Sequence, residues 1–312
     1  MTLFSSTLNQ IAFLFCFIAM GYGLMKAGLL PGNSSAVLSK LENMLFVPAL
    51  VLGTFMNNFT VECLGSARSL LIISTVIGLI AIGFALIVSR LVTKDSYIRK
   101  IYTYGLSFSN FGFMGNAVVS SLFPDMFFEY LIFTLPLWIF IYMWGVPVLL
   151  ISDAGKKQSL KDRAKAFCNP MFGAMIAGMI IGLSGVKLPQ WLNSFVDISG
   201  SCMSPVAMLL TGIVVSAIPL KKTFSDVRTI IISLVRLLVM PLIFIAATLL
   251  LPSNPQNEIW YLCALCSLAM PLGLNTIVIP SSLGKDTTVA ASMAIISHLL
   301  SAITIPLIFM IK

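Results

Sequence analysis

Two apolar stretches of the chain contain residues that interrupt a helix and could bind a small polar solute. The first stretch, "SNFGFMGNAV" (109–118), holds Asn110, Gly112, Gly115 and Asn116. An interrupted helix leaves backbone N–H groups unpaired, and the N-terminus of the half-helix that follows carries a partial positive charge. Together with neutral side-chain amides, such N–H groups can bind an anion.

The second stretch, "MPLGLNTIVIPSSLGKD" (270–286), carries Pro271, Gly273, Asn275 and Thr276. Proline removes a backbone donor, and glycine permits local unwinding. Unpaired peptide groups are tolerated at membrane depth only where they are buried in protein or line a watery cavity. The sequence therefore predicts two broken helices that enclose a substrate site. The alternative interpretation is two simple kinks that pack neighbouring helices.

Two ionisable residues fall inside apolar stretches, where charged groups are costly and are functional hypotheses by default. Arg236 could pair bidentately with an anionic substrate, or it could pair with backbone carbonyls or a carboxylate nearby. His298 is the only histidine. It could carry a proton, because histidine titrates near neutral pH, or it could stay neutral between helices.

Three further charged residues lie near the ends of predicted helices. Lys40 and Glu42 are expected near one end of the second helix, and Asp197 near the start of the seventh. We expect them, with His298, to be candidates for coupling transport to protons or ions. The alternative is that they extend to the polar interface of the membrane.

The composition predicts an all-α integral membrane protein. Of 312 residues, 58% are hydrophobic and 10% are charged, and the mean hydropathy is +1.01. Soluble domains carry about 25% charged residues. Within the apolar stretches, "GMIIG" (178–182) predicts close packing of two helices. Ten stretches are long enough to cross a bilayer: 8–28, 36–56, 66–90, 100–122, 128–151, 167–185, 192–218, 227–251, 259–283 and 288–311.

Lysine and arginine are distributed unevenly between the two sides that ten membrane spans define. One side carries 15 of them and the other 3, while Arg236 lies inside a span. The positive-inside rule places the basic side in the cytoplasm and both termini on the non-cytoplasmic side. We therefore expect a multi-pass protein of the plasma membrane with a basic cytoplasmic loop at 153–166. Lipid contact accounts for the net charge of +8, and no nucleic-acid partner is expected.

The two halves of the chain resemble each other at a nearly constant shift. "GFMGNAVVSSLFPD" (112–125) aligns without gaps to "GLNTIVIPSSLGKD" (273–286) at a shift of 161. Three shorter matches, beginning at residues 46, 67 and 146, follow at shifts of 157, 160 and 159. Because each half holds five spans, the halves would be inverted repeats: 1–152 and 167–312. In this arrangement the broken helices are the fourth and the ninth. Inverted repeats are typical of alternating-access carriers.

Three motifs together resemble the auxin efflux carriers, a family that includes plant PIN transporters and bacterial organic-acid permeases. They are "KLENMLFVPALVL" (40–52), "SNFGFMGNAV" and "MPLGLNTIVIPSSLGKD". The chain departs from the family at Asn116-Ala117, where a hydrophobic residue and a proline often follow the glycine. The resemblance implies a scaffold of spans 1, 2, 6 and 7 and a moving core of spans 3–5 and 8–10. It also implies elevator-like movement, anionic substrates and often a homodimer.

These observations predict a secondary transporter of a small organic anion, such as a carboxylate, that is linked to protons or driven by the membrane potential. A sodium-coupled symporter of the bile-acid type, which shares the broader architecture, is an alternative, as is a channel or a sensor that uses the same cavity. The sequence has no Walker A motif for ATP and no HExxH or GxSxG motif. We therefore expect neither an enzyme nor a cofactor or metal site.

Overall fold

The computed structural model describes residues 3–60, 63–151, 170–217, 226–249, 255–282 and 285–311. The predicted basic loop at 153–166 lies outside the described residues. Within them the chain is helical and contains no strand, apart from one isolated bridge. Six of the described helices are long and apolar enough to cross a membrane, and four shorter apolar helices accompany them. The prediction of an all-α membrane protein is confirmed.

The helices of the first half coincide with the first five predicted spans, and three of these spans contain π-helical segments. The π-helical turn Glu42–Phe46 joins α2 to α3, and the turn Phe111–Gly115 leads into α6. The π-helix Ile141–Ile151 continues α7. The bounds are α1 Leu3–Lys26, α2 Ser34–Leu41, α3 Val47–Asn58, α4 Cys63–Val92, α5 Ser96–Ser107, α6 Asn116–Leu122 and α7 Phe127–Phe140.

The helices of the second half coincide with the remaining five predicted spans. The π-helical turn Val235–Val239 joins α13 to α14, so that Val227–Thr248 forms one continuous helical span. The bounds are α9 Pro170–Ser184, α10 Gln190–Ser201, α11 Met203–Ser216, α13 Val227–Leu234, α14 Met240–Thr248, α15 Pro255–Leu268, α16 Asn275–Ser282 and α17 Thr288–Met310.

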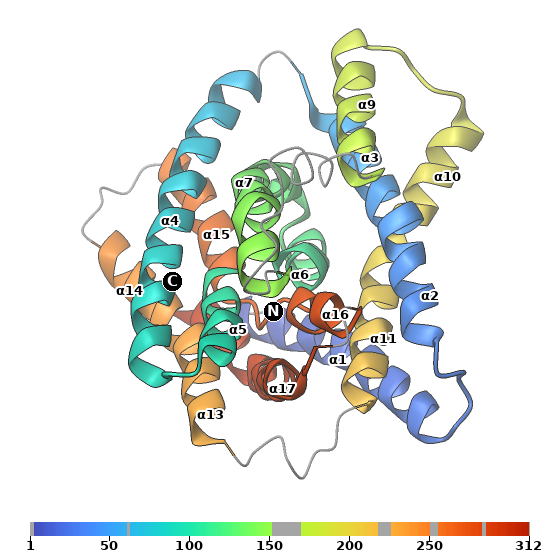
Figure 1. Cartoon of the computed structure of the whole chain (residues 1–312). Coiled ribbons are helices and arrows are strands. Elements are labelled where there is room, and N and C mark those ends of the chain that lie inside the picture. The colour runs from blue at the N-terminus through green and yellow to red at the C-terminus, as the bar shows by residue number, and fades with distance from the viewer. Residues whose placement is uncertain are drawn as a thin grey trace.

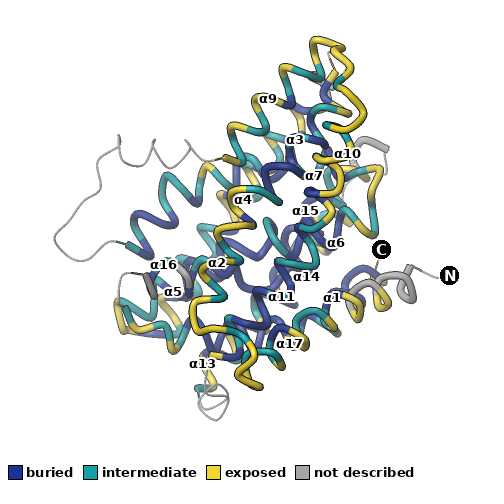
Figure 2. Tube along the Cα trace, turned by 90° about the vertical axis from the view of Figure 1, so that its right-hand side faces the viewer, coloured by how far each residue is buried: buried dark blue, intermediate teal, exposed yellow. Residues whose placement is uncertain are grey.

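The surface is apolar where helices face outward, and many polar side chains are buried. Ile80 of α4, Ile180 of α9 and Ile198 of α10 are each more than 60% exposed, and Figure 2 shows exposed residues along the outer faces of these helices. Arg236 and His298 are buried. An outer surface of this kind is suited to lipid rather than water, because large exposed apolar patches are rare on soluble monomers.

Two helix pairs lie in close contact at one side of the bundle, where α3 runs beside α9 in Figure 1. Gly178 and Gly182 of α9 leave no room for a side chain, because a Cβ atom there would lie 2.9 Å from the carbonyl oxygens of Leu52 and Phe55, respectively. The prediction that "GMIIG" permits close packing is confirmed. Gly212 of α11 meets α1 in the same way.

On the other side, α4 packs along α5 and α7, and α13 packs against α17. The interrupted segments α6, α15 and α16 lie between α4 and α3, and α5 lies next to α4 (Figure 1). The fold thus buries both interruptions in the middle of the protein, where their open backbone groups are shielded from lipid.

Candidate functional site

The two predicted interruptions lie side by side and run antiparallel. Helix α5 ends at Ser107, and helix α15 ends at Leu268. Ser109 and Leu272 form an antiparallel bridge, and the N–H of Asn110 donates to the carbonyl of Pro271 at 2.7 Å. Each interruption therefore satisfies part of the backbone of the other, and the four half-helices meet at a single crossing.

The same geometry leaves two helix carbonyls without their usual partners. Ser267 O would receive the N–H of residue 271 in a continuous helix, but Pro271 has none. Leu106 O would receive the N–H of Asn110, but that group donates across the crossing to Pro271. Both carbonyls belong to the last turn of a half-helix, so they carry the partial negative charge of its C-terminus.

Arg236 supplies donors to both carbonyls, and Ser267 O also accepts a hydrogen bond from the Ser109 hydroxyl at 2.6 Å. Nη1 of Arg236 donates to Leu106 O at 2.8 Å, and its Nη2 donates to Ser267 O at 3.2 Å. Its Nε donates to Met270 O at 3.3 Å. The side chain is 1% exposed. The predicted bidentate partner of a substrate thus lies at the crossing, but its guanidinium nitrogens are directed at the protein backbone.

Asn110 forms a short hydrogen-bonded chain with His298. The Nδ1 atom of His298 lies 2.8 Å from the carbonyl oxygen of Ala294, so this nitrogen carries the proton. Its Nε2 atom then accepts from Nδ2 of Asn110 at 3.3 Å. The imidazole is neutral in this arrangement, and it holds the Asn110 amide in one orientation.

Asn275 and Thr276 begin α16, directly after the second interruption. Nδ2 of Asn275 donates to the hydroxyl of Tyr104 at 3.3 Å. The hydroxyl of Thr276 donates to Gly273 O at 2.8 Å and so closes the first turn of the helix. Asn275 therefore faces the crossing, whereas the Thr276 hydroxyl serves the backbone next to it.

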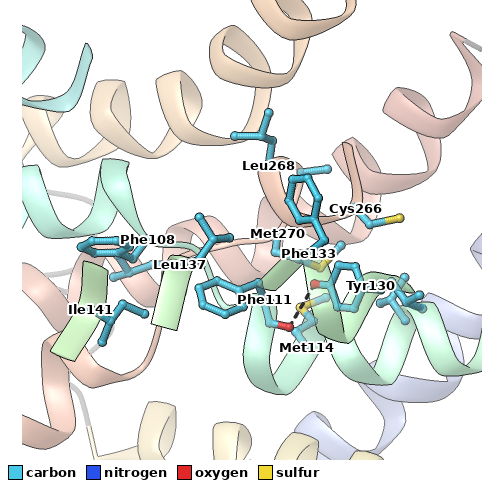
Figure 3. Close-up of a cluster of buried hydrophobic side chains, with 14 of the residues drawn as sticks. Phe108, Phe111, Met114, Tyr130, Phe133, Leu137, Ile141, Cys266, Leu268 and Met270 are labelled. Carbon is cyan, nitrogen blue, oxygen red and sulfur yellow. Dashed lines mark hydrogen bonds between the residues drawn. The ribbon is translucent and has the colours of Figure 1, made fainter. Parts of the chain in front are cut away.

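Two glycines permit the close approach of the crossing segments. A Cβ atom on Gly273 would lie 3.1 Å from the carbonyl oxygen of Ser109, and one on Gly115 would lie 2.2 Å from the Tyr130 hydroxyl. That hydroxyl donates to the carbonyl of Phe111 at 3.0 Å. Figure 3 shows this bond within a cluster of buried apolar side chains that surrounds the crossing.

A small cavity lies at the crossing, and four of the predicted substrate-binding residues line it. Its volume is about 20 Å³. That is close to the minimum that one water molecule needs and too small for an organic anion. The predicted residues are Asn110, Gly112, Gly273 and Asn275, and the other lining residues are Tyr104, Ser109, Phe111, Phe113, Trp138, Ile141 and Leu274.

Aromatic residues that the sequence reasoning missed close this cavity. Trp138 of α7 lies so near Gly112 that a Cβ atom there would be 2.5 Å from its ring, and the Trp138 ring packs edge-on against Phe111. Tyr104 packs in the same manner on Phe108. A tryptophan in an apolar stretch gives no signal by itself, because most such residues only fill the core.

A larger cavity, of about 750 Å³, separates α3 and α10 from the ends of α6 and α7. Asp197 lines it, together with Thr54, Asn57, Ser120 and Asp125. This cavity is large enough for a small organic molecule. It lies between the closely packed helices on one side and the end of the interrupted helix on the other.

The structure does not bring Lys40, Glu42 and Asp197 together. Lys40 is exposed, whereas Glu42 is fully buried, and within the described part of the chain neither of its carboxylate oxygens has a hydrogen-bond partner. Asp197 packs near Gly53, which lies 11 residues after Glu42, or about 16 Å along a helix. Of the other predicted residues, Asn116, Gly115, Pro271, Thr276 and Arg236 are close to the crossing without lining its cavity.

The fold and the crossing define a class: a helical protein of the membrane with buried polar groups around two interrupted helices. The chain belongs to the family described as membrane transport proteins, whose family model matches residues 6–309. This is the PIN/AEC-type family, so the predicted membership among auxin efflux carrier-like proteins is confirmed. Comparison with curated proteins gives no match.

Proposed function

We propose that the protein is a secondary active transporter that moves a small organic anion, such as a carboxylate, across the plasma membrane. The observation that carries this proposal is the antiparallel crossing of two interrupted helices around a buried cavity with Asn110 and Asn275 in its wall. Discontinuous helices of this kind form the substrate site in many secondary transporters. Membership of a membrane transport family supports the same conclusion.

The arrangement also supports ten spans in two inverted repeats. Leu106 and Ser267, whose carbonyls both bind Arg236, are separated by 161 residues, which is the shift that aligns the two halves. Helix α1 packs along α11, and α9 packs along α3. In an inverted repeat these pairs are equivalent, because span 1 corresponds to span 6 and span 7 to span 2.

The proposed mechanism is elevator-like alternating access, in which one group of spans moves against another. The scaffold would consist of spans 1, 2, 6 and 7, and the core of spans 3–5 and 8–10. The closed cavity of about 20 Å³ represents a state without room for substrate, so transport requires the core to move and open it. The larger cavity beside Asp197, between the proposed scaffold and core, offers a route for substrate on one side of the membrane.

An anion is the favoured substrate because the polar groups at the cavity are neutral or positively polarised. The N-terminus of α16 begins at Asn275, and the side-chain amides of Asn110 and Asn275 can donate hydrogen bonds. Among the residues that the structure describes, no carboxylate lines this cavity. A carboxylate substrate would thus meet donors without an opposing negative charge.

The Asn110–His298 contact supports linkage to protons. In the neutral state His298 accepts from the Asn110 amide nitrogen. A second proton on the ring would turn Nε2 into a donor, so the Asn110 amide would have to rotate and present its oxygen to the ring. The amide nitrogen would then face the cavity and donate to a carboxylate. Proton and anion would therefore bind cooperatively.

The test is flux into proteoliposomes of the purified protein, with carboxylates chosen by a thermal-shift screen that begins with lactate and succinate. We expect saturable flux that follows an imposed gradient, which separates a carrier from a channel. Asn110→Ala and Asn275→Ala should each reduce flux at least about tenfold, because each removes a hydrogen bond to a charged group.

Asn43→Ala is the matched control, because Asn43 is exposed and, among the described residues, its side chain bonds only to Ser39, one turn earlier in the chain. It should transport as the unaltered protein does. Unchanged flux in both cavity variants, with the protein folded, would contradict the proposed site.

A further inference from the structure

The charge of Arg236 is balanced by helix ends rather than by an acid. Its guanidinium donates to three backbone carbonyls and contacts the sulfur of Met240 at 3.6 Å. Among the residues that the structure describes, no carboxylate forms an ion pair with it. Burying a cation without an acidic partner costs free energy unless its N–H groups donate hydrogen bonds to polar acceptors such as backbone carbonyls. Here the C-termini of α5 and α15 supply those dipoles.

The two helix ends are equivalent positions of the repeat, but the cation comes from one half alone. Leu106 and Ser267 differ by 161 residues, and the same shift relates Arg236 to Thr75 of α4. The Thr75 hydroxyl donates within its own helix, to Leu71 O at 2.7 Å. Arg236, from the second half of the chain, therefore bonds to the ends of both α5 and α15. The equivalent position in the first half carries no cation.

A cluster of unpaired carbonyls at the C-termini of half-helices is the type of environment that holds a dissolved cation in other transporters with broken helices. The carbonyls of Leu106, Ser267 and Met270 form a comparable cluster here, in which Ser267 O also accepts a hydrogen bond from the Ser109 hydroxyl. The guanidinium of Arg236 fills it and satisfies the carbonyls through a planar fork of donors.

We propose that Arg236 is a tethered cation that occupies the place of a dissolved coupling cation at the crossing. It holds α5 and α15 together and cancels the negative ends of their dipoles, so the positive N-terminal ends dominate the field at the cavity. On the proposed function, on which this role rests, transport proceeds without sodium. Arg236 is a positioning residue, because its donors reach the backbone and not the substrate.

Removal of the side chain should convert the cluster into a site for a free cation. The variant Arg236→Ala removes the guanidinium donors from the three carbonyls and leaves a space where the guanidinium was, while Ser267 O keeps the Ser109 hydroxyl as a donor. The first test compares the melting temperature of the purified protein in sodium chloride, guanidinium chloride at a few millimolar, and choline chloride at equal ionic strength. Sodium or guanidinium should raise the melting temperature of the variant and leave that of the unaltered protein unchanged.

Arg228→Ala is the matched control, since Arg228 lies in the same helical span, Val227–Thr248, but is exposed. It should show no specific response to either cation. Arg236→Met fills the space of the aliphatic stem and removes the guanidinium donors. It replaces Arg236→Ala if the alanine variant does not fold, and it should show the same response to both cations. Arg236→Lys keeps a charge and should fold without a cation response.

Flux provides the second readout. Arg236→Ala should transport at least about tenfold more slowly in choline chloride, with partial recovery in sodium or guanidinium chloride, whereas the unaltered protein should transport equally in all three. The proposal is overturned if the unaltered protein requires sodium for transport. It is also overturned if Arg236→Ala and Arg236→Met fold but respond to neither cation, or if Arg236→Lys responds to sodium or guanidinium. The melting experiment needs no substrate, so it decides the role of Arg236 even if the Asn110 and Asn275 variants transport normally.

Discussion

The substitution Gly115→Ala should destabilise the protein because the new methyl group would collide with the Tyr130 hydroxyl. Gly115 has φ −62° and ψ −46°, an ordinary helical conformation. By backbone preference alone, alanine would stabilise this position by about 0.5–1 kcal/mol. Its Cβ atom, however, would lie 2.2 Å from the hydroxyl oxygen of Tyr130, a distance that no pair of unbonded atoms of this kind tolerates.

The expected loss of folding free energy comes from two changes at Tyr130: displacement of its ring and loss of its hydrogen bond. The ring has to move, in a fully buried site, and overpacking of a core typically costs about 1–3 kcal/mol. Movement also breaks the bond from the Tyr130 hydroxyl to Phe111 O, which is worth about 1 kcal/mol. After the helix preference is subtracted, Gly115→Ala should cost about 1–3.5 kcal/mol.

The decisive measurement is the same substitution in a Tyr130→Phe background. Without the hydroxyl, the nearest atoms to the new Cβ are the ring carbon Cζ at 3.3 Å and Met270 Cγ at 3.5 Å, which small shifts can accommodate. Gly115→Ala should then be close to neutral, so the two substitutions should show a coupling of about 2 kcal/mol. Unfolding of the purified protein in detergent, by heat and by denaturant, measures all four members of the cycle.

Gly83→Ala serves as the control, because no atom of the described residues lies within 4 Å of a Cβ at Gly83 in α4. It should be neutral or slightly stabilising. If Gly115→Ala costs the same with tyrosine and with phenylalanine at position 130, the steric explanation is refuted. The destabilisation would then have to come from the π-helical turn itself.

Two further predictions concern proton-sensitive groups. His298→Gln keeps a partner for Asn110 but cannot be protonated, so flux should lose its dependence on pH between about 5 and 8; an unchanged pH profile would exclude His298 as the proton carrier. Asp286 lies between α16 and α17, and hydrogen bonds from the Thr288 hydroxyl and N–H lower its pKa. Its ionised form therefore stabilises the fold above the pKa of the unfolded state, and this contribution is lost as pH falls through the folded pKa. Asp286→Asn should lower the melting temperature at pH 7, with a smaller effect in acid; equal effects at both would contradict the assignment.

The sequence alone determined where the helices would break. Pro271 lacks a backbone donor wherever the chain places it, and the Asn and Gly residues near 110–116 and 273–275 weaken helices in any context. Apolar stretches of about 20 residues likewise specify membrane helices without knowledge of the fold. Local chemistry decides these features, so the all-α class and both interruptions could be predicted.

Only the tertiary structure decided which groups would complete the broken backbone. Arg236 meets a carbonyl 130 residues away in α5, and His298 meets an amide 188 residues away. Glu42 and Asp197 matched a pattern of coupling residues, but packing gives Glu42 no hydrogen-bond partner among the described residues. The free energy of these contacts comes from pairing groups that only the folded chain brings together, so no local pattern of residues could reveal the partners of Arg236.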